Sequence, residues 1–297
     1  MIEEAVVASP AGDEEAMEAG RRIMALSRQL LDAMLGLSVP DVSRTERVFQ
    51  SLQDVSVKLG LDTSDLAAEI AYRRLQVALA RGFEDEIEAR LTELHAIGGR
   101  YATAADRLLY RRAYDDWTRA PHDTDLAVAV VRHGLNLMTQ FGEDAEALND
   151  PVVYGLHDTV ASAAAVVWRL DQDVRMREIA IEIDERLIVS GRRSPGVLTR
   201  FAELSESAGR IEDALDAWRT LLAGYDAESE DWFEARYQSL RLLLEIDQAR
   251  ARVVMDQHKL LHPSYGPEPW GEKLSDLDKQ IPAAAPAGVD DVGGGGG

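Results

Sequence analysis

Two histidines, His258 and His262, have the spacing in this sequence that best suits chemistry. They stand four positions apart in the segment HKLLH, so on a continuous helix both imidazoles lie on one face. A metal ion can bridge such a pair, as in the HExxH motif of zinc enzymes. Lys259 occupies the place of the glutamate and no third ligand is evident, so we predict no metal site. The alternative is a helix C-terminus ended by Pro263, where histidines interact well with the helix dipole.

No other pattern in the sequence predicts catalysis. The remaining histidines are scattered, and no glycine-flanked serine or SxxK motif pairs with them as a nucleophile: His95, His122, His133 and His157. Cysteine is absent, which removes thiolate nucleophiles and thiolate zinc ligands together. The glycine pairs match neither a dinucleotide-binding fingerprint nor a P-loop. We therefore expect no catalytic residues, no cofactor and no metal.

The charge balance of the chain selects among classes of partner. Lys and Arg number 32 and Asp and Glu number 53, which gives a net charge of -21 at pH 7. Such a field repels phosphate backbones and anionic lipid headgroups at long range. We therefore expect a basic peptide or protein as partner, and neither nucleic acid nor a membrane surface. The alternative is that the acidic excess only keeps the protein soluble. The oligomeric state stays open.

The sequence predicts neither a membrane span nor a secretion signal. The longest apolar stretch, residues 159–168, has ten residues, whereas a membrane span needs about 20. The beginning of the chain is acidic and lacks the positive and apolar regions of a Sec signal. A cytoplasmic protein is the expectation.

Apolar residues recur at spacings of three and four along most of the chain, and no segment alternates like a strand. The chain is therefore predicted to be all-α, with turns at glycine and proline. Four residues are expected to cap helix starts, namely Asp41, Asp62, Asp123 and Ser229. The predicted helices span residues 13–36, 43–59, 63–81, 84–97, 101–119, 123–140, 151–171, 173–190, 196–208, 211–223, 229–246, 248–261 and 268–281.

The two ends of the sequence differ in composition from the helical part. Residues 282–297 are rich in Pro, Ala and Gly without apolar periodicity, so we expect a disordered tail. Residues 1–12 are expected to be flexible for the same reason. Between the ends we expect helical hairpins over 13–141 and repeats over 151–281, divided by the stretch 142–150.

Small residues recur at offsets in the thirties. Ala180 and Ala214 lie 34 positions apart, Ala214 and Ala251 lie 37 apart, and Ala89 and Ala127 lie 38 apart. Such periods are typical of stacked helical hairpins, because one hairpin cannot bury its apolar face alone. We expect these alanines where neighbouring helices approach closely.

The segment 207–218, SAGRIEDALDAW, resembles the second half of a tetratricopeptide repeat (TPR) of bacterial type. Gly209, Ala214 and Trp218 take the places of the family's turn glycine, alanine and aromatic residue. Trp232 stands where the first helix of the next repeat carries its tryptophan. The Leu-Gly pair of the family's first helix is absent.

The resemblance covers residues 164–281, with residues 13–150 forming hairpins that are only TPR-like. It implies a right-handed α-solenoid of antiparallel helix pairs. A C-terminal capping helix over 268–281 is predicted by its apolar stripe, which has spacings of four, three and four: Trp270, Leu274, Leu277 and Ile281.

The TPR resemblance implies a non-catalytic scaffold or adaptor that binds a peptide or protein segment on a concave helical face. The residues expected to line that face are Arg200, Glu203, Phe233, Tyr237 and Arg241. Two alternatives stay open: a regulatory or ligand-sensing helical domain of a larger bacterial system, and an unrecognised enzyme.

Overall fold

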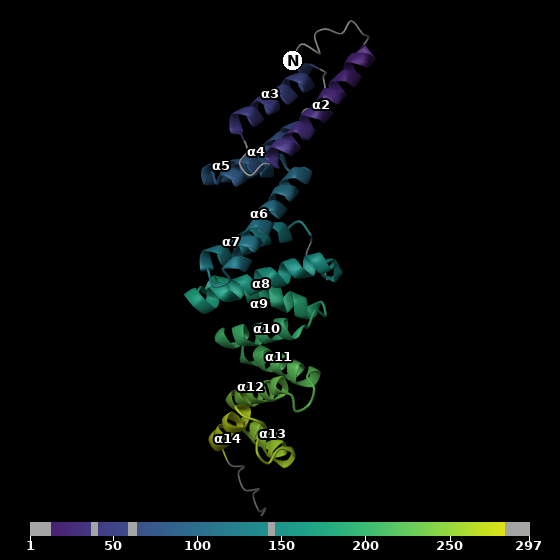
Figure 1. The fold of residues 1–297 in the computed structure, drawn as a ribbon. Coiled ribbons are helices and arrows are strands. Elements are labelled where there is room, and N and C mark those ends of the chain that lie inside the picture. The colour runs from purple at the N-terminus through teal and green to yellow at the C-terminus, as the bar shows by residue number, and fades with distance from the viewer. Residues whose placement is uncertain (1–12, 37–40, 59–63, 142–145, 283–297) are drawn as a thin grey trace, which may run out of the picture. The chain divides into compact units, whose positions relative to one another are not determined.

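The chain is all-α (Figure 1). The computed structural model describes residues 13–36, 41–58, 64–141 and 146–282, and these contain helices and turns but no strand. The helices are α2 (Asp13–Leu35), α3 (Val42–Lys58), α4 (Ser64–Arg81), α5 (Glu84–Ile97), α6 (Gly99–Arg119), α7 (Thr124–Met138), α8 (Pro151–Asp171), α9 (Val174–Val189), α10 (Pro195–Ser207), α11 (Ile211–Gly224), α12 (Glu230–Ile246), α13 (Gln248–Leu261) and α14 (Trp270–Gln280), with a short 3-10 helix, η1 (Ala147–Asn149), before α8. None of the described helices has the length and apolar character needed to cross a membrane.

The predicted helices are confirmed, and α5, α8 and α13 have the predicted ends. Side-chain caps, which need only the next few residues, mark two of the predicted helix starts, those of α7 and α12. The Asp123 carboxylate accepts a hydrogen bond from the Leu126 amide at 3.1 Å, and the Ser229 hydroxyl accepts one from Trp232 at 3.2 Å. The predicted cap Asp62 and the predicted flexible ends lie outside the described residues, apart from Pro282.

The chain divides into two compact units, unit 1 (Met1–Asp115) and unit 2 (Asp116–Gly297). The division falls within α6 and not at the stretch 142–150, where the sequence predicted it. The reason lies in the helices on either side of that stretch, because α7 and α8 pack against each other along much of their length. A break in the helical pattern therefore does not mark a break in the packing.

In unit 2, each helix from α7 to α13 packs against the next along the chain, and Figure 1 shows α8 to α12 following one another in a stack. Ala180, Ala214 and Ala251 have no exposed surface, as their spacing predicted. A larger side chain at a position buried this completely would have to displace its neighbours. Ala127 is equally buried, but its predicted counterpart Ala89 is exposed, so the prediction for Ala89 was wrong.

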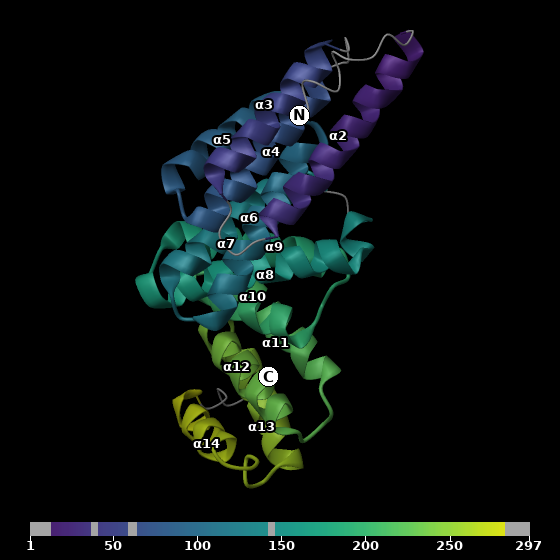
Figure 2. The same ribbon diagram turned by 45° about the horizontal axis from the view of Figure 1, so that its top comes forward.

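The last helix, α14, covers the end of unit 2 (Figure 2). It packs on α12, and its predicted stripe is buried: Trp270, Leu274, Leu277 and Ile281. Asp278 ties α14 to α13 by accepting hydrogen bonds from Arg252 and from Lys259, the latter at 2.9 Å. Burial acts to raise the pKa of Asp278, but hydrogen bonds from Lys259, Arg252 and Tyr265 outweigh it and lower that pKa to about 2.

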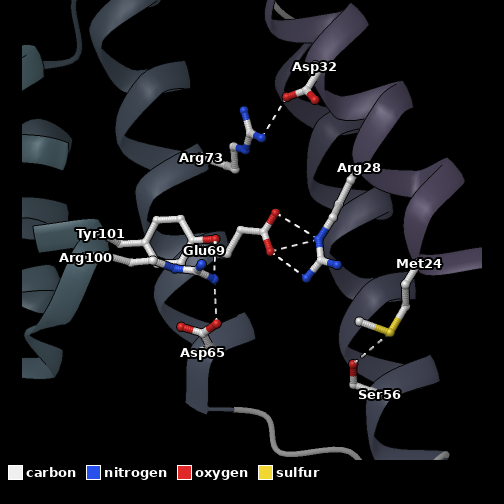
Figure 3. Close-up of polar contacts among 9 residues, drawn as sticks. All are labelled: Met24, Arg28, Asp32, Ser56, Asp65, Glu69, Arg73, Arg100 and Tyr101. Carbon is white, nitrogen blue, oxygen red and sulfur yellow. Dashed lines mark hydrogen bonds and ion pairs between the residues drawn. The ribbon is translucent and has the colours of Figure 1, made fainter. Parts of the chain in front are cut away.

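Unit 1 contains two apolar clusters. One joins α2, α3 and α4 around Leu31, Phe49 and Leu52, and the other joins α4, α5 and α6 around Leu75 and Leu94. Ion pairs add to this packing (Figure 3). Arg28 on α2 donates to both carboxylate oxygens of Glu69 on α4 at 2.9–3.0 Å. The other pairs drawn there are Arg73 with Asp32 and Arg100 with Asp65.

Candidate functional site

Arg200, the first residue predicted for the binding face, lies inside unit 2. Its guanidinium donates to both carboxylate oxygens of Asp184 on α9, at 2.8 and 2.5 Å, and to Asp158 on α8 at 2.8 Å. A further bond at 2.6 Å reaches the Ser162 hydroxyl. Asp184 has no exposed surface, and burial raises its pKa to about 6 although Arg200 opposes that shift. Arg200 therefore holds α8, α9 and α10 together and is not available to a partner.

Phe233 is also committed to the interior. It is 3% exposed, and its ring centroid lies 5.0 Å from that of Trp232 and 5.3 Å from that of His262. The Phe233 ring also lies against Gly266, where an added Cβ would come within 2.4 Å of the ring. Gly266 has a φ of +121°, so both its conformation and the space beside it require glycine.

The other three predicted residues are accessible and belong to α10 and α12. Glu203 is exposed and pairs with Arg169 at 2.7 Å. Tyr237 is half-buried, with its ring 5.8 Å from that of Trp270. Arg241 pairs with a glutamate of α10, Glu206, at 2.6 Å. Of the five predicted residues, the structure thus keeps three at the surface and places two in the core.

A residue that the sequence did not single out, Glu234 of α12, lies close enough to Glu203 to feel its charge. Burial raises its pKa, and the negative charges of Asp231 and Glu203 raise it further, while Lys273 opposes them. Glu234 is half-buried and makes no ion pair within 4.0 Å among the described residues. Its carboxylate therefore lacks the ion-pair partner that Glu203 and Glu206 of α10 have.

Tyr225 completes this surface. Burial raises the pKa of its hydroxyl, and the charge of Asp231 adds to the effect, while a hydrogen bond with Thr199 opposes it. We define the acidic face as Glu203, Tyr225, Asp231, Glu234 and Tyr237. It presents three carboxylates and two phenol rings, a combination that suits cationic side chains, since tyrosine rings and carboxylates both attract them.

Helical spacing alone could not have selected Glu234. Counting back from Tyr237, the positions three and four residues earlier are Glu234 and Phe233, and both lie near Tyr237 on a helix. The TPR frame favoured Phe233. The choice depends on how far α12 is rotated about its axis, which is set by its packing on α11 and α14.

The histidine pair packs against Trp232 and Phe233 of α12. His258 has no exposed surface, and its Nε2 lies 3.0 Å from the Tyr265 carbonyl oxygen, to which it donates. The His262 ring lies 4.9 Å from it, centroid to centroid. Within the part of the chain that the structure describes, no three His, Asp or Glu residues are grouped to hold a metal ion.

Comparison of the chain with protein-family models, with curated proteins and with solved structures found no match. What the site can do must therefore be inferred from its own residues. These are a half-buried carboxylate without an ion-pair partner, flanked by two further acids and two tyrosines.

Proposed function

We propose that this chain is a non-catalytic protein-interaction scaffold of TPR type, and that the acidic face receives Arg or Lys side chains of a peptide or protein segment. In this proposal unit 2 is a right-handed α-solenoid of antiparallel helix pairs. The sequential packing from α7 to α13 and the burial of Ala180, Ala214 and Ala251 support it.

The observation that carries the proposal is the environment of Glu234. Its carboxylate is removed from part of its water, is repelled by Asp231 and Glu203, and finds only Lys273 as an opposing charge. The Lys273 ammonium lies 4.1 Å from the Trp270 ring centroid and 5.8 Å from that of Tyr237, so it sits at the edge of the acidic face. A cation from a partner would relieve this repulsion, and the flanking Tyr225 and Tyr237 rings would cover its aliphatic stem.

The same charges argue against polyanionic partners. A net charge of -21 repels nucleic acid and anionic lipid, and the acidic face would add local repulsion. The field of the whole chain also speeds encounter with cations wherever they bind. A test of the proposal must therefore separate the acidic face from the overall field.

Two substitutions that change the net charge equally separate the two effects. Glu234→Gln removes the central carboxylate of the face, whereas Glu212→Gln removes an exposed carboxylate of α11 with the same change in net charge. Binding of a fluorescent octa-arginine peptide should weaken about fivefold or more in Glu234→Gln and remain near wild type in Glu212→Gln. Anisotropy titrations at two salt concentrations measure both affinities.

Association with the peptide should slow as salt rises, because steering by exposed charges is screened. Equal affinities of the two variants would attribute the binding to net charge and contradict a site at Glu234. Tight binding of duplex DNA by the wild-type chain would contradict the proposed class of partner.

A further inference from the structure

A cavity of about 220 Å³ lies among α7, α8 and α9 and shares no residue with the acidic face. Its apolar walls are Leu135, Met138, Ile179 and Ile183, of which Met138 and Ile183 are buried. An apolar cavity of ~150 Å³ is enough to hold benzene. This cavity therefore has room for a single ring with a small substituent.

His157 supplies a polar group to this cavity. His157 is 5% exposed, and its Nδ1 lies 2.9 Å from the Val153 carbonyl oxygen. A carbonyl only accepts, so Nδ1 carries the proton and the neutral ring presents a lone pair at Nε2. Among the residues that the structure describes, Nε2 has no hydrogen-bond partner.

The ring of His157 is neutral near pH 7. Burial lowers its pKa and the charge of Arg186 lowers it further, while the hydrogen bond to Val153 opposes them. The pKa of His157 therefore lies below the ordinary value for histidine. Nε2 is an acceptor under these conditions, and His157 lines the cavity together with its apolar side chains.

The other polar residues at the cavity are already paired. The Glu182 carboxylate accepts a hydrogen bond from Arg186 at 2.7 Å, so this pair brings no net charge. The Thr139 hydroxyl donates to the Asn136 carbonyl at 2.7 Å. A charged ligand would lose water here without gaining a counter-charge, whereas a neutral molecule would not.

We propose that this cavity binds a small neutral molecule with an apolar body and one hydrogen-bond donor, phenol being the simplest that fits, with its hydroxyl donating to Nε2 of His157. The apolar walls exclude water from the ring, and the sulfur of Met138 makes favourable contacts with aromatic edges. Binding here is independent of peptide binding on the acidic face. It would provide the ligand-sensing property that the sequence leaves open as an alternative.

The test compares three probes of similar size on the full chain: phenol, anisole and toluene. NMR titrations with 15N-labelled histidine follow the ring nitrogens directly. Phenol should move the Nε2 resonance of His157 and bind about tenfold more tightly than anisole or toluene, which lack a donor. Equal affinities of the three probes, or shifts at other histidines only, would overturn the proposal.

Two substitutions sharpen the assignment. His157→Phe removes the acceptor and keeps a ring in its place, so phenol should lose its advantage over anisole. His122→Phe changes an exposed histidine that does not line the cavity, so the advantage should persist. A His157→Phe chain that still prefers phenol would contradict the role of Nε2. If that variant fails to fold, the probe series on the wild-type chain decides alone.

Discussion

Units 1 and 2 both bury alanines in their helix packing, but they differ in how deeply they bury the ion pairs between helices. In unit 2, alanines without exposed surface let consecutive helices approach closely, as at Ala180, Ala214 and Ala251. Unit 1 buries Ala78 and Ala105 as completely, although the predicted Ala89 is exposed. Positions buried this completely tolerate little change in volume in either unit.

The arginine–carboxylate ion pair that joins helices at Arg200 in unit 2 is more deeply buried than the one at Arg28 in unit 1. In unit 2 the Arg200 side chain is 10% exposed and that of Asp184 is 0% exposed. In unit 1 the Arg28 side chain is 41% exposed, although its partner Glu69 is 8% exposed. Water can therefore replace Arg28 far more readily than Arg200. A charge left alone is costly only where water cannot reach it.

The largest difference between the units should come from removing these arginines. We expect Arg200→Ala to destabilise unit 2 by about 3–5 kcal/mol near pH 8, because Asp184 is left buried without its partner. Arg28→Ala should destabilise unit 1 by about 1 kcal/mol. All five tryptophans lie in unit 2, so their fluorescence during urea unfolding reports on that unit, while circular dichroism reports on both.

The pH dependence of Arg200→Ala checks the cause of its effect. In the wild type the pKa of Asp184 is raised to about 6, so its contribution to stability is full below about pH 4 and is lost as pH rises through 6. Removing Arg200 raises this pKa further, so the variant should keep losing stability above pH 6. A destabilisation independent of pH between 5 and 8 would point to lost packing instead.

A medium effect is expected from enlarging the alanines. Ala214→Phe should destabilise unit 2 by about 1–3 kcal/mol, because α11 cannot move away from its neighbours without losing their contacts. Ala89→Phe, at the exposed position that the sequence grouped with the alanines of unit 2, should stay within about 0.5 kcal/mol of wild type. Urea unfolding of both variants measures the difference, and similar losses would show that burial does not set the cost of the added ring.

The smallest effect on stability is expected from breaking the Asp278 ion pairs that join α13 and α14. Asp278→Asn should destabilise unit 2 by roughly 1 kcal/mol or less at pH 7. Because the pKa of Asp278 is lowered to about 2, this stability is present above about pH 4 and is lost as pH falls towards 2. The variant and the wild type should therefore converge in acid.

Asp65→Asn in unit 1 is the matched control for this tie. Asp65 pairs with Arg100, but both side chains are 67% exposed, so the substitution should leave stability unchanged at every pH. Thermal unfolding across a pH series compares the two variants. A difference at Asp278 that persists at pH 2 would exclude its charge as the source.

Much of this fold follows from short-range patterns. The ends of α8 and α13 could be predicted because a helix begins and ends through interactions among residues a few positions apart. The apolar stripe of α14 could be predicted for the same reason, since its residues share one helix face. The burial of Ala214 followed from the repeat offset, which reflects contact between neighbouring elements.

The candidate site depends on contacts between residues that are far apart in the sequence, which local patterns do not predict. Arg200 meets Asp158 and Asp184, which lie 42 and 16 positions before it, so its burial could not be deduced from its own neighbours. Phe233 is buried whereas the next residue of α12, Glu234, is only half-buried, because successive residues point about 100° apart around a helix. Helical periodicity thus predicts which elements form, while the rotation of each helix against its neighbours, which only long-range packing sets, selects the side chains that a partner can reach.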